Sequence, residues 1–298
     1  MLKYLDRLYC WFPQTNSVWR SLRYGVRVLA NVYVRWLMPI SNKQSEVNAD
    51  TIIVSFTSYP ARIKNVWMTV ATLLAQSYQN MYVVLWLSKD QFPEGTRGLP
   101  KKLQRLRKKG LDIRFVDDDL RPHKKYFYAT QEFPNNNIVT VDDDILYHPS
   151  LVSYLVSYHR KYPNCVVCNR GVLIKRTAYR TWPLNTFYCE ERRDVMPTGI
   201  GGVLYPAHIF DETPIFDSDT IRKTCLNGDD LWLNLMTRLA GRKVVQTAFK
   251  TGLITILSSQ SSALCQSNVN ENYNDLQIKT LNSWVRKVLN VDFMINVK

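Results

Sequence analysis

The stretch Asn137-Ile-Val-Thr-Val-Asp-Asp-Asp-Ile145 joins a short apolar run to three consecutive acids. The run is β-branched throughout and predicts a buried strand that ends at the first aspartate. Three adjacent carboxylates repel one another, and a divalent cation, which takes oxygen ligands, offsets that repulsion most readily. Because alternate residues of an extended chain point to one side, Asp142 and Asp144 are expected to face a ligand together. A solvated acidic turn is the alternative interpretation.

Segments typical of strands and of helices alternate on the N-terminal side of this stretch. We expect strands at Thr51–Phe56, Met81–Leu87 and Leu111–Val116, with helices at Val66–Gln76 and Lys101–Lys109 between them. This alternation predicts an α/β fold with a mostly parallel central sheet and helices on both faces. Ligands of such sheets bind beyond the carboxyl ends of the strands, which is where the acids lie. Further elements are expected at Leu151–Tyr162, Val166–Ile174, Gly201–Tyr205 and Asp229–Leu239.

The first fifty residues differ in composition from the rest. Residues 17–38 carry apolar side chains at helical spacing, and Arg20, Arg23, Arg27 and Arg35 fall on the opposite face. Four arginines make a membrane span too costly. The pattern therefore indicates a basic amphipathic helix, which either lies in a membrane interface or packs on the protein itself. We expect residues 1–50 to form this segment and a linker, and residues 51–298 to form the catalytic domain.

The overall charge indicates which classes of molecule the protein binds. The chain has 298 residues and a formal net charge of +14, which favours polyanions such as nucleic acid, phosphorylated small molecules or anionic lipid. Its six cysteines are predicted to be reduced core residues, despite the C-x-x-C spacing of Cys165 and Cys168, and this usage indicates a reducing, cytoplasmic compartment.

Three further segments supply candidate site residues. The loop Thr57–Arg62 follows the first strand with hydroxyls, an aromatic ring and a guanidinium, which suit a nucleotide as well as an ordinary turn. Lys125 belongs to a basic cluster that could hold a diphosphate or neutralise the second triplet, Asp117–Asp119, for which a solvated turn is predicted. Asp229 and Asp230 begin a predicted helix; capping explains one of them, and the other could be a general base.

In this order and spacing, the motifs resemble those of GT-A fold nucleotide-sugar glycosyltransferases, including the exostosin type and bacterial polysaccharide enzymes. The matching motifs are Thr57–Arg62, Val141-Asp-Asp-Asp-Ile145, the loop Gly199–Gly202 and Asn227-Gly-Asp-Asp230. The resemblance implies that Asp144 and Asp142 bind Mn²⁺ or Mg²⁺ and that Asp142 and Asp143 contact the sugar nucleotide. It also implies that Asp230, with Asp229 beside it, acts at the acceptor. The nucleoside diphosphate would be held by Thr57, Tyr59, Arg62 and Lys125.

The leading hypothesis is a metal-dependent glycosyltransferase that uses a nucleoside diphosphate sugar and a glycan or lipid-linked acceptor. It would work in the cytoplasm, on the inner face of a membrane that residues 17–38 contact, with no nucleic-acid partner. The Gln-x-x-Arg-Trp motif of processive relatives is absent, which favours transfer of a single sugar. Two alternatives stay open: a nucleotidyltransferase that forms sugar nucleotides, and a non-catalytic protein that binds anionic lipid or nucleic acid.

Overall fold

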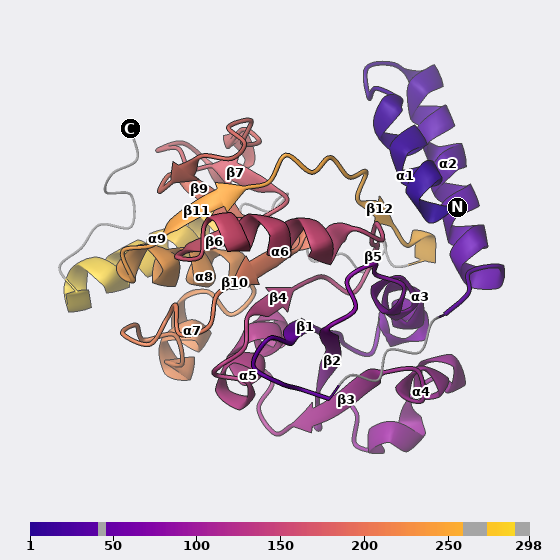
Figure 1. Cartoon of the computed structure of the whole chain (residues 1–298). Helices are drawn as coiled ribbons and strands as arrows, with labels where there is room; N and C mark the ends of the chain where they lie inside the picture. The colour runs from indigo at the N-terminus through magenta and orange to yellow at the C-terminus, as the bar shows by residue number, and fades with distance from the viewer. Residues whose placement is uncertain (41–45, 259–272, 290–298) are drawn as a thin grey trace.

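An eight-stranded sheet lies at the centre of the computed structural model, which describes residues 1–40, 46–258 and 273–289 (Figure 1). The strand order is β3-β2-β1-β4-β10-β6-β11-β8. All strands except β10 and β8 run in one direction, so the predicted mostly parallel α/β fold is confirmed. The strands are β1 (Ile52–Thr57), β2 (Met81–Ser88), β3 (Leu111–Val116), β4 (Ile138–Thr140), β6 (Cys165–Cys168), β8 (Glu191–Arg192), β10 (Val203–Tyr205) and β11 (Lys243–Gln246).

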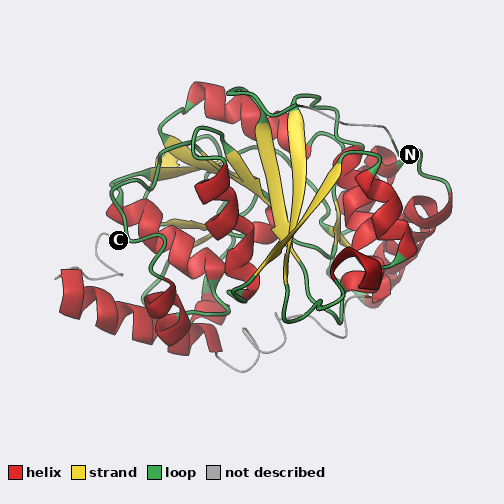
Figure 2. Cartoon of the chain, turned by 90° about the horizontal axis from the view of Figure 1, so that it is seen from below, coloured by secondary structure: helices red, strands yellow, loops and turns green. Residues whose placement is uncertain are grey.

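Helices cover both faces of the sheet (Figure 2). They are α3 (Ile63–Leu74), α4 (Lys101–Arg107), α5 (Lys124–Glu132), α6 (Leu151–Lys161), α7 (Ser218–Thr224), α8 (Asp229–Leu239) and α9 (Tyr273–Leu289). Alternate residues of β1 explain this layering, because Val54 packs in one core with α3, while Ile53 packs in another with Ala129 of α5. A strand that is buried on both faces reads as a continuous apolar run, which is the pattern at the start of β1.

The strand order reverses at β1: β2 and β3 lie on one side of β1, and β4 lies on the other. Strand β2 pairs with one edge of β1 and β4 with the other, and all three are parallel. The loops that leave the carboxyl ends of β1 and β4 therefore diverge from a shared crevice, which is where open α/β sheets bind ligands. Residues 58–62 and the acid triplet 142–144 are these two loops.

The N-terminal residues form a helical hairpin, α1 (Leu2–Trp11) and α2 (Ser17–Trp36), beside α3. Ala30 and Val34 of α2 are buried in the same core as Val54. Two of the four arginines expected on the polar face are bound to the protein itself, in agreement with the alternative that this helix packs on the protein. Arg23 donates to the carbonyl oxygens of residues 9 and 12 at 2.6 and 2.9 Å, and Arg27 donates to that of Thr255 at 3.2 Å. These carbonyls satisfy guanidiniums that face the protein.

Several local predictions also change. The single strand expected at Val166–Ile174 divides into β6 and β7 (Gly171–Leu173), and β7 pairs with β9 (Val195–Pro197) in a separate ribbon. Cys165, Cys168 and Cys225 are buried as predicted, but Cys10 and Cys189 are exposed. Cys265 and part of the predicted linker Ser41–Asp50 lie outside the described residues. No helix among the described residues has the length and hydrophobicity to cross a membrane.

Candidate active site

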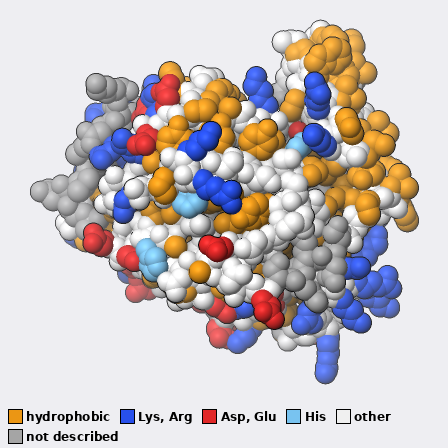
Figure 3. Space-filling model, in the orientation of Figure 1, with side chains coloured by type: hydrophobic (Ala, Val, Ile, Leu, Met, Phe, Trp, Pro, Cys, Tyr) orange, Lys and Arg blue, Asp and Glu red, His pale blue; other side chains and the backbone are white. Residues whose placement is uncertain are grey.

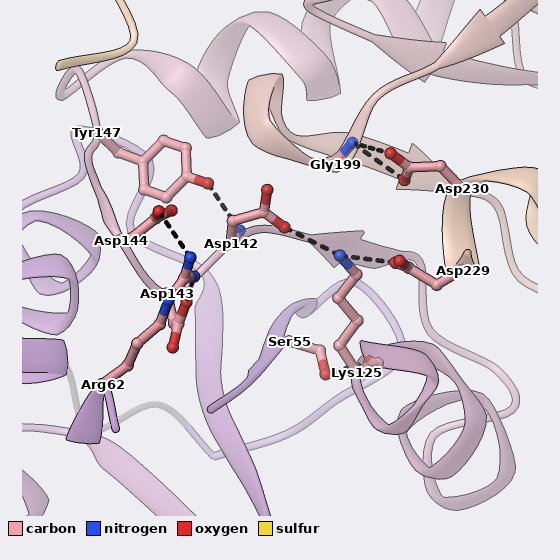
Figure 4. Close-up of polar contacts among 10 residues, drawn as sticks. All are labelled: Ser55, Arg62, Lys125, Asp142, Asp143, Asp144, Tyr147, Gly199, Asp229 and Asp230. Atoms are coloured by element: carbon pink, nitrogen blue, oxygen red, sulfur yellow. Dashed lines mark hydrogen bonds and ion pairs between the residues drawn. The ribbon is translucent and has the colours of Figure 1, made fainter. Parts of the chain in front are cut away.

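Asp143 anchors the two loops of the crevice to each other (Figure 4). Its carboxylate accepts hydrogen bonds from Ser58 at 2.5 Å and from Arg62 Nη1 at 2.6 Å, and all three residues are buried. The carbonyl oxygen of Asp143 also accepts from Thr69 of α3 at 2.9 Å. Both carboxylate oxygens of Asp143, the middle acid of the triplet, therefore take part in structural hydrogen bonds. It fixes the loop after β1 against the loop after β4.

Asp144 is the least well compensated acid of the triplet. Its Oδ2 lies 3.2 Å from Arg62 Nη2. Burial raises the pKa of Asp144 to about 7, Arg62 opposes that rise, and the neighbouring acids Asp142 and Asp143 add to it. One guanidinium shared with Asp143 therefore does not offset the desolvation of this carboxylate. Additional positive charge beside Asp144 would lower its pKa and keep it ionised.

Lys125 bridges two groups of acids. Its Nζ lies 3.0 Å from Oδ1 of Asp142 and 2.7 Å from Oδ2 of Asp229. Burial would lower the pKa of Lys125, but Asp142, Asp229 and Asp230 outweigh burial and hold the pKa well above its usual value. The lysine is therefore a permanent cation. Its carbonyl oxygen accepts a short hydrogen bond from Ser55 of β1, which fixes the start of α5 on the sheet.

Asp229 and Asp230 are neighbours with opposite protonation behaviour. Burial would raise the pKa of Asp229, but Lys125 and His123 lower it below the usual value. Burial and the adjacent Asp229 raise the pKa of Asp230 to about 8, against the effects of Lys125 and of the Gly199 N–H. That N–H lies 3.1 Å from each carboxylate oxygen of Asp230. At neutral pH Asp229 is therefore ionised, whereas Asp230 is mostly protonated and ionises as the pH rises through about 8.

Gly199 permits the close approach of its loop to these charged groups. A Cβ at this position would lie 2.9 Å from Nζ of Lys125, 3.1 Å from Oδ1 of Asp142 and 3.3 Å from Oδ1 of Asp230. Any larger residue would push apart the groups that pair here. The glycine loop Gly199–Gly202 thus lies against Asp142 and Asp230.

The remaining predicted residues have other local contacts. Thr57 donates its hydroxyl to the carbonyl oxygen of Trp86 at 2.8 Å, which supports the end of the β1–β2 pairing. The ring of Tyr59 lies 5.6 Å from the Arg62 guanidinium. In the triplet 117–119 each acid pairs with a different cation, as expected for a neutralised surface turn.

Sequence reasoning missed two residues that shape the site. Ser58 holds Asp143, and the hydroxyl oxygen of Tyr147 accepts the backbone N–H of Asp142 at 2.7 Å. Ser58 stands inside the loop that the sequence singled out, so its position after β1 was the available signal. Tyr147 carries no such signal, because its contact depends on the turn that the triplet makes.

A divalent cation fits this site only if a ligand shares it. Among the described residues, no group of three or more His, Cys, Asp or Glu side chains could hold a metal ion by itself. Asp142 and Asp144 nevertheless supply the hard oxygen ligands that Mn²⁺ and Mg²⁺ accept, and the raised pKa of Asp144 marks a carboxyl that a cation would ionise. Phosphate oxygens and water would complete the ligand set of such an ion.

Comparison with known proteins gives the fold. No protein-family model matches the chain, and no curated protein matches it significantly. The chain is similar to the structure of the mannosyltransferase PcManGT from Pyrobaculum calidifontis in complex with GDP-Man and Mn²⁺, with a TM-score of 0.50 and 12% identity over 98% of this chain and 76% of that one. It also matches an apo UDP-glucose pyrophosphorylase (TM-score 0.43, 12% identity, 71% of this chain and 97% of that one) and a UDP-glucose pyrophosphorylase from Acinetobacter baumanii (TM-score 0.43, 8% identity, 77% and 99%). At these identities the likeness concerns architecture alone: the fold of this chain resembles that of a GT-A glycosyltransferase.

Proposed function

We propose that this protein is a glycosyltransferase that depends on Mn²⁺ or Mg²⁺ and transfers a sugar from a nucleoside diphosphate donor to a glycan or lipid-linked acceptor. One observation carries the proposal. Four chain segments bring Arg62, Lys125 and five carboxylates together where β1 and β4 end, the crevice in which sheets of this kind bind ligands. Such a mixture of cations and acids suits a substrate that is anionic at one end and carries hydroxyls at the other.

The donor would lie along the loop after β1. Tyr59 offers a ring face beside the Arg62 guanidinium, and Thr57 lies at the carboxyl end of β1. Lys125 supplies a permanent positive charge for the departing diphosphate. A divalent ion held by Asp144 and Asp142 would neutralise further charge on that leaving group.

Asp230, rather than Asp229, is proposed to serve the acceptor. With a pKa of about 8, Asp230 becomes a carboxylate that can take a proton as the pH rises through this value, whereas Asp229 is paired with Lys125. In an inverting reaction the acceptor hydroxyl gives its proton to Asp230, its oxygen bonds to the anomeric carbon, and the bond from that carbon to the diphosphate breaks. In a retaining reaction Asp230 would hold the acceptor hydroxyl in place.

We propose that residues 51–298 form the catalytic domain and that residues 1–50 attach this domain to the cytoplasmic face of a membrane. Exposed apolar side chains on α2 support this assignment. Transfer of a single sugar and the absence of a nucleic-acid partner also remain predictions.

A donor screen tests the proposal. Thermal stability and donor hydrolysis would be measured with UDP- and GDP-sugars, with and without Mn²⁺, for the wild type, Asp144→Asn and the exposed control Asp117→Asn. We expect one donor class to stabilise the wild type and the control only with Mn²⁺, and Asp144→Asn to lose that response. A nucleotidyltransferase would instead incorporate labelled pyrophosphate into a nucleoside triphosphate. Absence of any donor response in folded protein would overturn the proposal in favour of a binding protein.

A further inference from the structure

The helical hairpin α1–α2 carries most of the large hydrophobic side chains that the described structure leaves exposed. More than half of them lie within residues 1–37, and Figure 3 shows this concentration as the hydrophobic surface at the upper right, where Figure 1 places the hairpin. Exposed apolar side chains that gather on one part of a surface mark binding sites more often than side chains that are scattered singly. The exposed members are Met1, Tyr4, Leu8, Trp11, Val18, Leu22, Tyr24, Leu29, Val32, Trp36 and Leu37.

Helix α2 is apolar on two opposite sides. Val26, Ala30 and Val34 face the core and are at most 4% exposed. A second row, formed by Val18, Leu22, Leu29, Val32 and Trp36, has steps of three, four or seven residues, which place it on one side of the helix. This row faces away from the core, and its end residues Val18 and Trp36 are 65% and 72% exposed. Packing in the core therefore does not account for the second row.

The hairpin and the neighbouring segment Arg97–Lys109 carry almost exclusively positive charges. Asp6 is the sole acid among residues 1–40, and it is buried against the N–H of residue 252. Every charged side chain from Arg97 to Lys109, a stretch that includes α4, is a cation. Lys102 joins this basic segment to the hairpin, because its Nζ lies 5.6 Å from the centre of the Trp36 ring.

We propose that α1, α2 and α4 together form a docking surface for an anionic lipid bilayer, with α2 lying in the interface and the cations of α4 on the headgroups. This goes beyond the contact of residues 17–38 proposed above, since it assigns the electrostatic attraction to α4 and removes Arg23 and Arg27 from it. A second copy of the chain would suit the spacing of the row, but it would bring cations against cations. Lipid headgroups supply the missing negative charge.

Hydrogen bonds connect the docking surface to the candidate active site. Asn31 of α2 donates to the carbonyl oxygen of Thr255 at 3.1 Å. Thr255 belongs to β12 (Ile254–Thr255), which pairs with β5 (Ile145–Leu146), and the carbonyl of Asp144 accepts from the N–H of residue 256 at 2.8 Å. A bilayer bound to α2 would therefore hold the acid triplet in a fixed orientation relative to the membrane.

Vesicle co-sedimentation of the full chain tests the apolar half of this surface. Wild type would be compared with Val18→Ser/Leu29→Ser on α2 and with a control of the same residue types and similar exposure on α9, Leu276→Ser/Val288→Ser. We expect the wild type and the control to bind vesicles of phosphatidylcholine with 30% phosphatidylglycerol at least tenfold more tightly than vesicles of phosphatidylcholine alone. The α2 variant should lose at least tenfold in affinity.

A second pair of variants tests the charged part of the docking surface. Lys101→Gln/Arg105→Gln on α4 should weaken binding severalfold, whereas Arg160→Gln/Lys161→Gln on α6 should not. Equal binding by the α2 variant and the wild type, or no binding by the wild type, would overturn the proposal. A wild-type dimer that the α2 variant abolishes, without vesicle binding, would assign the surface to a second copy instead. Melting temperature and donor response report separately on the fold and the catalytic proposal.

Discussion

Replacing Lys125 by Met would remove the charge that holds the centre of the candidate site together. The variant leaves Asp229 buried without its cation and removes the partner of Asp142. Breaking a buried ion pair from one side costs about 3–5 kcal/mol. An unfolding entropy of about 2.1 cal/mol/K per residue amounts to about 0.6 kcal/mol/K for a chain of 298 residues. We therefore expect the melting temperature at pH 8 to fall by roughly 5–8 °C.

The pH dependence of this loss makes the prediction specific. In the wild type the pKa of Asp229 is lowered, so its stabilisation is present above the unfolded-state pKa and is lost as pH falls through the folded-state pKa. In the variant burial dominates and raises that pKa, so the acid destabilises the fold when ionised and ceases to do so when protonated. The difference between variant and wild type should therefore shrink from pH 8 towards pH 4.

Urea denaturation at pH 8, 6 and 4 measures this difference. The matched control is Lys89→Met, which removes a lysine from an exposed ion pair with Asp117 at 2.6 Å. Exposed pairs contribute about 0–1 kcal/mol, so the control should change little at any of these pH values. An equal loss for Lys125→Met at pH 8 and pH 4, or a loss no larger than that of the control, would refute the reasoning.

Three further perturbations test other parts of the site. Asp230→Asn should lower kcat by about 10²–10⁴-fold with little change in KM, and an unchanged kcat would contradict the role of a base. A pH–rate profile of the wild type should show kcat rising with pH around 8. Because the folded-state pKa of Asp144 is raised to about 7, its contribution to stability is fully present below pH 4 and is lost as pH rises through 7. Mn²⁺ with the donor nucleotide should therefore raise the melting temperature more at pH 8 than at pH 5, and a larger shift at pH 5 would speak against a metal at Asp144. Gly199→Ala should cost about 1–3 kcal/mol in urea denaturation, since its Cβ would lie 2.9 Å from Nζ of Lys125, whereas a neutral result would mean that the loop moves freely.

Local patterns were sufficient for the fold class. The β-branched run at the start of β1 predicted a strand, and its burial on both faces follows from the consecutive apolar residues Ile52–Val54. The helix predicted at Asp229–Leu239 has these bounds in the structure, because acids favour its N-terminus and apolar spacing continues to its end. Such signals depend on neighbours in the chain, so they can be read without the tertiary structure.

Helix α2 shows what local sequence patterns did not predict. Its amphipathic spacing predicted a helix, but the predicted apolar face is largely the exposed one, and Arg23 and Arg27 turn towards the protein. The sequence left open whether this helix packs on the protein or lies in a membrane. The inward side combines the buried Val26, Ala30 and Val34 with arginines that donate to the carbonyl oxygens of Tyr9 and Thr255, and the sequence of α2 does not reveal these acceptors.

The amino-acid sequence by itself determined which chemical groups follow which element. Acids follow β4, hydroxyls and Arg62 follow β1, and two acids begin α8. Only the tertiary structure decided which acid does what. Asp143 is held by Ser58 and Arg62, and Asp229 by Lys125, while Asp230 keeps a raised pKa. The physical reason is that a carboxyl's protonation depends on burial and on charges within a few ångströms, and here those charges come from distant parts of the chain.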